Sequence, residues 1–253
     1  MDKNQTYIPD CLYDSDNDFE IPSLRLDCQP SMCEIPFVCY GEQARTFEMN
    51  GHGVLHFYTD DYRYNTIYDK PQIVLQHNPA SIVEPNFSTF NEMPIAFAMQ
   101  AIYKKRWIAR TMQEHGITVF VDLNVAAKYY KLNLVGVPVG YHAFCTRGYS
   151  DRLHYLEYEY MLARQVAADN VDKLVFVIYG GGSECRQFAK EHGCIYVNPI
   201  IVKKNRLKAD IRKIDQTVAF FNEEFSPTKA IEEATSNIRL TQIESYVKQI
   251  DNN

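Results

Sequence analysis

The sequence predicts an α/β protein with a mostly parallel sheet, right-handed crossovers between its strands, and further helices at the C-terminal end. Three observations lead to this fold class. Short apolar runs recur along the chain, and most of them end at Asp, Asn, Pro or Gly, which is typical of buried parallel strands. Segments with helical periodicity lie between these runs. The chain has 253 residues, of which 46% are hydrophobic, so it can bury one sizeable core. The sheet is expected to be open or curled toward a partial barrel.

The first part of the chain is acidic. Residues 1–61 contain twelve Asp or Glu and three Lys or Arg, a charge of −9, so the other 192 residues carry +3. Residues 1–20, which include YDSDNDFE at 13–20, are interpreted as an acidic and weakly ordered leader, with an acidic interaction tail as the alternative. Residues 21–204 are expected to form a single α/β domain.

Six apolar runs are the predicted strands of that domain. They lie at Val54–Tyr58, Ile82–Val83, Ile117–Leu123, Leu134–Val139, Leu174–Tyr179 and Cys194–Val197.

Helices are predicted between these strands, at Pro94–Glu114, Asp151–Ala168 and Ser183–Glu191. In the second of them, apolar residues recur at spacings of three and four, which places one apolar stripe against the sheet. Asp151 is its expected N-cap, because a carboxylate can accept a hydrogen bond from a free N–H of the first turn.

Residues 205–253 are predicted to be a C-terminal helical extension. Apolar residues recur at helical spacing on both sides of Pro227. These helices either pack on the domain's own sheet or protrude as a pair that forms a homo-oligomer through residues 205–250.

Composition narrows the class of protein. No run of eighteen apolar residues occurs, and the first residues lack the pattern of a signal peptide, so we expect a cytoplasmic protein without a membrane partner. The seven cysteines are odd in number and several lie in apolar stretches, which favours reduced thiols. A net charge of −6 does not favour tight nonspecific binding to nucleic acid, although it leaves that partner possible.

Polar residues at the ends of the predicted strands are the candidates for a site, because ligands of parallel α/β proteins bind at the carboxyl ends of strands. Asp61, Glu84 and Asp122 follow or end three of these strands. We expect them to be catalytic and to hold a divalent cation, Mg or Mn, since hard cations prefer carboxylate oxygens. The alternative is structural: Asp61 caps a turn, Glu84 is exposed, and Asp122 hydrogen-bonds a loop.

A phosphate-bearing ligand is the second expectation for this edge. The stretch VFVIYGGGSECRQF at 175–188 runs from a strand through three glycines into a helix, so its N–H groups suit an anion, with a plain turn as the alternative. The segment YKKRWIAR at 103–110 interleaves basic and aromatic residues that suit phosphates and bases, with the solvated face of a helix as the alternative. The predicted ligand contacts are Arg63, Asn86, Ser88, Arg106, Trp107, Thr146, Gly180, Gly181, Gly182 and Ser183.

The order of several segments resembles a known family. These are IPSL at 21–24, HFYTDDYRYNTIYDKP at 56–71, EPNFSTFNEMPIAFAMQAIYKKRW at 84–107, HGITVFVDLN at 115–124, LVGVPVGYHAFCTRG at 134–148 and VFVIYG at 175–180. Together they are similar to domain of unknown function 4417, a family common in phages, prophages and plasmids. The resemblance covers roughly residues 20–182. It implies an α/β protein of a mobile genetic element in a bacterial cell, and it implies no established reaction.

The chain departs from the family at two strand ends. The family's usual Pro-Asp-Phe-Ser is Pro85-Asn86-Phe87-Ser88 here, so a neutral amide replaces an acid. The third strand ends at Asp122 without the usual proline-containing segment and tryptophan. If the missing acid were a general base or a metal ligand, Asn86 could not replace its charge.

Two functions from different classes follow from these observations. The first is an enzyme or binding domain for a phosphate-bearing ligand, either a nucleotide or a nucleic-acid end, at the C-terminal edge of the sheet. The second is a noncatalytic accessory protein that binds a partner through its C-terminal helices.

Overall fold

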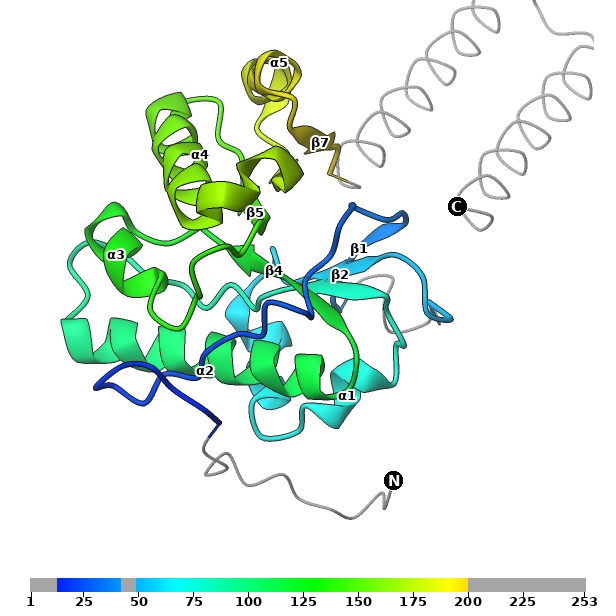
Figure 1. Cartoon of the computed structure of the whole chain (residues 1–253), viewed down its shortest axis with the longest axis vertical. Helices are drawn as coiled ribbons and strands as arrows, with labels where there is room; N and C mark the ends of the chain where they lie inside the picture. Colours follow the sequence, from blue (N-terminus) through cyan, green and yellow to red (C-terminus); the bar gives the residue numbers. More distant parts are fainter. Residues whose placement is uncertain (1–12, 42–48, 200–253) are drawn as a thin grey trace, which may run out of the picture. The chain divides into compact units, whose positions relative to one another are not determined.

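The computed structural model describes residues 13–41 and 49–199 of the chain (Figure 1). The predictions for residues 1–12, for the C-terminal helices at 205–253 and for self-association through them lie outside the described residues. Among the helices of the described part, none is both long and apolar enough to cross a membrane.

Seven parallel strands form one nearly closed, barrel-like sheet, which confirms the predicted fold class. Each strand pairs with the next one along the chain, so the order in the sheet is the order in the sequence. The strands are β1 (Phe37–Cys39), β2 (Val54–His56), β3 (Ser81–Val83), β4 (Thr118–Asp122), β5 (Ala143–Arg147), β6 (Val175–Tyr179) and β7 (Ile195–Val197).

Helices connect the strands. They are α1 (Gln72–Leu75), α2 (Ile95–Glu114), α3 (Tyr130–Asn133), α4 (Leu153–Ala167) and α5 (Gly182–His192). Helix α2 packs against β4, α4 against β5, and α5 against β7 (Figure 1). The three helices predicted from the sequence are therefore confirmed to within about two residues at each end.

One predicted strand is wrong, and two strands of the structure, β1 and β5, are not among the predicted ones. Residues 134–139 form turns, because Gly136 has a φ of 76° and its backbone packs closely against the carbonyl of Pro22. The Gly136 carbonyl also accepts a hydrogen bond of 2.8 Å from Leu24 N–H. The strand at this place in the sheet is β5, nine residues further on, and β1 has only three residues and no periodicity to reveal it.

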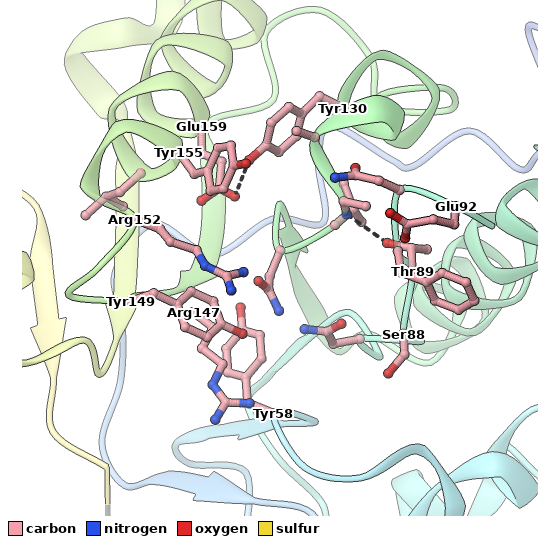
Figure 2. A pocket seen from close by; sticks show the side chains of 18 of the residues that line it. Tyr58, Ser88, Thr89, Glu92, Tyr130, Arg147, Tyr149, Arg152, Tyr155 and Glu159 are labelled. Atoms are coloured by element: carbon pink, nitrogen blue, oxygen red, sulfur yellow. Dashed lines mark hydrogen bonds between the residues drawn. The ribbon is translucent and has the colours of Figure 1, made fainter.

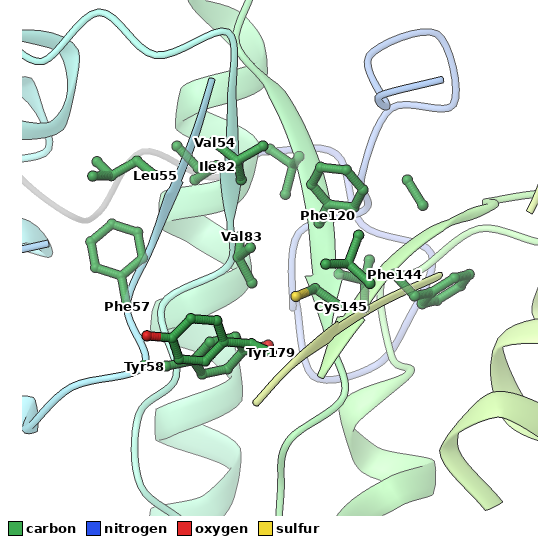
Figure 3. Close-up of a cluster of buried hydrophobic side chains, with 14 of the residues drawn as sticks. Val54, Leu55, Phe57, Tyr58, Ile82, Val83, Phe120, Phe144, Cys145 and Tyr179 are labelled. Atoms are coloured by element: carbon green, nitrogen blue, oxygen red, sulfur yellow. The ribbon is translucent and has the colours of Figure 1, made fainter. Parts of the chain in front are cut away.

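Aromatic side chains fill the interior of the curled sheet (Figure 3). The ring of Tyr179 on β6 lies 5.7 Å from that of Phe37 on β1 and 4.4 Å from that of His56 on β2. Since β6 is not a neighbour of β1 or β2 in the sheet, these contacts mean that the sheet curls until its two sides face each other. The carboxyl ends of the strands therefore surround one mouth.

Candidate functional site

A cavity of about 390 Å³ opens at the carboxyl ends of the strands (Figure 2). Tyr58 follows β2, Ser88 follows β3, Asn124 follows β4, Arg147 ends β5, and Glu159 comes from α4. Five segments that are far apart in the sequence thus meet here because parallel strands end at one edge. The volume is in the range of small-molecule sites, about 300–1,000 Å³.

Two arginines form the positive wall of the cavity. The guanidinium carbon of Arg147 lies 5.5 Å from the centre of the Tyr149 ring, and that of Arg152 lies 5.7 Å from it. Both guanidinium groups therefore lie over the ring of Tyr149, which also lines the cavity. We call Arg147 and Arg152 the arginine pair.

Arg147 and Arg152 differ in their carboxylate partners. Across residues 13–41 and 49–199, no carboxylate lies within ion-pair distance of Arg147. The Nε of Arg152 lies 3.5 Å from Asp151 Oδ2, and both of these side chains are exposed. Asp151 is not the N-cap that the sequence predicts, because Arg152 precedes the first turn of α4 and makes no side-chain cap bond.

A buried carboxyl group, that of Glu159, forms part of the cavity lining. Tyr130 Oη donates a hydrogen bond of 3.1 Å to Glu159 Oε1 (Figure 2). Thr146 Oγ1 donates one of 2.6 Å to Glu159 Oε2. Burial raises the pKa of Glu159 to about 8, and the two hydroxyl donors act in the opposite direction. Thr146, a predicted ligand contact, is buried and binds Glu159 instead.

This raised pKa predicts a pH-dependent stability that Glu159→Gln removes. The unfolded carboxyl titrates near 4.5 and the folded one near 8, so the folded state holds the extra proton between these values. Stability is therefore full below the unfolded pKa and falls as the pH rises through this window, by at most about 1.4 kcal/mol per pH unit. Urea unfolding at several pH values should show that the variant gains on the wild type toward pH 8. Glu157→Gln, an exposed change on the same helix, should follow the wild type, and parallel curves for Glu159→Gln would contradict the account.

Four charged side chains form a buried network beneath the cavity. Lys105 Nζ lies 3.4 Å from Asp122 Oδ2 and 3.8 Å from Glu84 Oε2, and Arg106 Nη1 contacts Glu84 Oε1 directly. All four are at most 2% exposed. We call these residues the buried quartet; its two carboxylates are balanced by two cations.

The buried quartet reaches the cavity through one tyrosine. Tyr58 Oη donates a hydrogen bond of 3.0 Å to Asp122 Oδ1, and the ring of Tyr58 lines the cavity. Burial raises the pKa of Asp122 to about 6, although the nearby Lys105 charge lowers it. The network therefore fixes the floor of the cavity and does not open into it.

The structure does not bring the three residues of the predicted divalent-cation site together. Within the described ranges, no three His, Cys, Asp or Glu side chains are placed to hold one metal ion. Glu84 and Asp122 lie together, and Lys105 and Arg106 of α2 supply the positive charge beside them. Asp61 lies apart from them and has another role.

Asp61 braces the strand-end loop that lines the cavity. Its Oδ2 accepts a hydrogen bond of 3.0 Å from Ser88 N–H, and its Oδ1 accepts one of 2.9 Å from Ser88 Oγ. Ser88 and Asn86, two of the predicted ligand contacts, line the cavity, whereas Asp61 and Arg63 do not belong to its lining. Arg63 lies 4.0 Å from Asp60 and beside the ring of Tyr62.

The basic segment of α2 contributes to the core. Trp107 and Arg106 are fully buried, and Arg106 Nη2 donates a hydrogen bond of 2.6 Å to the carbonyl of Asn133. Arg110 pairs with Glu114 at 2.8 Å. This corrects the expectation that Arg106 and Trp107 contact a phosphate and a base, because neither side chain reaches the surface.

Packing requires a glycine at position 181 of the triple glycine. A Cβ on Gly181 would lie 2.4 Å from Cys185 Sγ and 2.7 Å from the backbone of Gly148, so only glycine fits there. Gly180 N–H donates to the carbonyl of Val197 at 3.0 Å. Gly180, Gly181 and Gly182 have φ values of 78°, 86° and 79°, which favour glycine, and none of residues 180–183 lines the cavity.

Sequence reasoning missed the residues that give the cavity its charge. The predicted ligand contacts do not include Arg147, Tyr149, Arg152 or Glu159, all of which line the cavity. The stretch CTRGYSDR at 145–152 held the signal, because two arginines flank a glycine directly after a buried strand.

Comparison with known protein families identifies the family of this chain. The family described as Domain of unknown function (DUF4417) matches residues 13–188. The chain belongs to this family. The match includes all the strands from β1 to β6 and every segment that lines the cavity.

Two relatives link this DUF4417 chain to phages. It is 30% identical over 113 residues to the Gene 1 protein of Mycobacterium phage D29 and, over the same length, to the Gene 1 protein of Mycobacterium phage L5. The aligned part is 42% of this chain and 40% and 47% of the two relatives, so the chain spans less than half the length of either. No solved structure matches.

Proposed function

We propose that this phage-related DUF4417 protein binds a phosphate-bearing ligand in the cavity, with the arginine pair contacting the phosphate. The observation that carries the proposal is Arg147, whose guanidinium lies at a strand end in the cavity lining without a carboxylate partner in the part of the chain that is described. A guanidinium presents several N–H donors in a fork that matches phosphate oxygens.

Two further features of the cavity support an anion. Helix α4 begins at Leu153, beside the cavity-lining Arg152 and Tyr155, so the positive end of its dipole is near the arginine pair. Glu159 lies in the same lining, but its raised pKa favours the neutral form up to about 8, so it adds little negative charge at neutral pH.

Replacing Arg147 by methionine tests the proposal. Removing a charge-assisted hydrogen bond to phosphate is expected to cost about 1.5–3 kcal/mol, which is roughly a 10- to 150-fold loss of affinity. Thermal-shift and calorimetric titrations with ribose 5-phosphate would measure it. The fold should persist, because Arg147 is exposed.

Arg164→Met is the matched control. Arg164 is also an exposed arginine beside a tyrosine ring, 5.7 Å from the centre of Tyr160, but it lies outside the cavity lining. It should leave affinity unchanged. Equal affinity of the wild type and Arg147→Met for ribose 5-phosphate would refute the proposed contact.

A further inference from the structure

The two sides of the cavity carry different chemistry. Figure 2 shows the arginine pair with Tyr149 on one side, and Ser88, Thr89 and Glu92 of the loop after β3 on the other. We call residues 86–92 the facing loop. Thr89 Oγ1 accepts a hydrogen bond of 2.8 Å from Ala126 N–H, and Lys128 Nζ lies 3.3 Å from the Asn91 carbonyl, so hydrogen bonds hold this loop to the segment after β4.

The cavity is larger than a phosphate needs. Its volume of about 390 Å³ is many times the roughly 30 Å³ that one water molecule takes in the liquid, and a phosphate group has only five heavy atoms. A phosphate on the arginine pair would therefore leave most of the cavity, including the facing loop, for an organic part of the ligand.

The remaining lining suits a flat, polar group. The side-chain amides of Asn86 and Asn124 line the cavity and make no hydrogen bond to the described part of the chain. An amide both donates and accepts, which is the pattern that pairs with the edge of a nucleobase.

An exposed aromatic ring lies in the same lining. Phe90 of the facing loop is 54% exposed, although its neighbour Phe87 is buried. An exposed phenylalanine in the same lining as these amides offers a stacking surface for a base. Glu92, also in the lining, can accept hydrogen bonds from sugar hydroxyls or exocyclic amino groups.

We infer that the ligand is a nucleotide unit with a terminal phosphate. Its phosphate contacts the arginine pair, and its base stacks on Phe90 within reach of the amides of Asn86 and Asn124. This inference rests on the proposed function, because it requires the phosphate to lie at Arg147 and Arg152. It adds the base and the residues that recognise it.

The test compares ligands that share the phosphate and differ in the base. The full chain is titrated calorimetrically with ribose 5-phosphate, with adenosine, guanosine, cytidine and uridine 5′-monophosphates, and with a short single strand that carries a 5′-phosphate. We expect at least one monophosphate or the strand to bind about fivefold or more tightly than ribose 5-phosphate, the smallest gain expected from one stacked base. Binding of the strand identifies a nucleic-acid end, and binding of the monophosphate alone identifies a free nucleotide; both support the inference.

Phe90→Ala isolates the base from the phosphate. It should remove this gain and leave the affinity for ribose 5-phosphate unchanged. Phe97→Ala, which removes another exposed phenylalanine outside the cavity lining, should change neither. Because Phe90 is exposed, its loss does not threaten the fold.

The failure of the inference differs from the failure of the proposed function. If ribose 5-phosphate binds through Arg147 but no base adds affinity, or if Phe90→Ala leaves the gain intact, the nucleotide inference is wrong and the phosphate site stands. If none of the phosphates binds, both are wrong.

Discussion

Glu84→Gln is expected to lower the free energy of unfolding by about 3–5 kcal/mol, because it leaves a buried cation without its partner. Arg106 is fully buried, and Glu84 is the carboxylate that its Nη1 contacts. The same carboxyl accepts a hydrogen bond of 3.1 Å from Asp122 N–H, at the end of the neighbouring strand. The substitution therefore disturbs the charge balance of the buried quartet and the strand ends that it joins.

Urea unfolding followed by circular dichroism measures this loss. Glu157→Gln, the same change on the exposed face of α4, is the control and should lie within about 0.5 kcal/mol of the wild type. A loss of less than about 1 kcal/mol for Glu84→Gln, in the range of exposed ion pairs, would show that the quartet is not buried as described.

Trp107→Ala is expected to destabilise the fold by about 3–5 kcal/mol, because it removes a large side chain from a close-packed core. Trp107 is fully buried, and its ring lies 5.4 Å from that of Tyr68 and 6.0 Å from that of Tyr13. The substitution leaves a cavity between α2 and the segments that cover it.

Phe97→Ala is the matched control, since it removes an aromatic ring from the same helix at a position that is 62% exposed. Thermal and urea unfolding should separate the two variants clearly. Similar stabilities would mean that Trp107 is at the surface, as a nucleic-acid role for the basic segment requires.

The periodicity of the sequence predicts much of the fold for a physical reason. Helices α2, α4 and α5 each repeat an apolar stripe over eleven or more residues, and β4 and β6 are five-residue strands with apolar residues on both faces. Such patterns follow from local geometry. Strand β1 could not be found in this way, because three residues are too few to show a period.

At residues 134–139, apolar composition alone wrongly predicts a strand, because it ignores the backbone conformation. This run contains Gly136 and Pro138, and in the structure it forms turns that contact the segment around Pro22. Leu134 and Val137 pack against the core without belonging to a strand, and only tertiary contacts show this.

The candidate site, like the fold, is only partly predictable from the sequence. The rule that ligands bind at the carboxyl ends of parallel strands selects Asn86 and Ser88, and both line the cavity. It cannot show which partner each strand-end acid will meet. Glu84 and Asp122 meet Lys105 and Arg106 because one turn of α2 faces the ends of β3 and β4, and this depends on packing between distant segments.

The most direct test of the phosphate site is a nuclear magnetic resonance titration of the isotope-labelled full chain with ribose 5-phosphate. The account predicts that the side-chain Nε–H signals of Arg147 and Arg152 and the side-chain amide signal of Asn124 move in a saturable way. The backbone signals of Gly182 and Ser183 should stay in place. Saturable shifts at Gly182 and Ser183 with none at the arginine pair would contradict the account and assign the phosphate to the glycine loop.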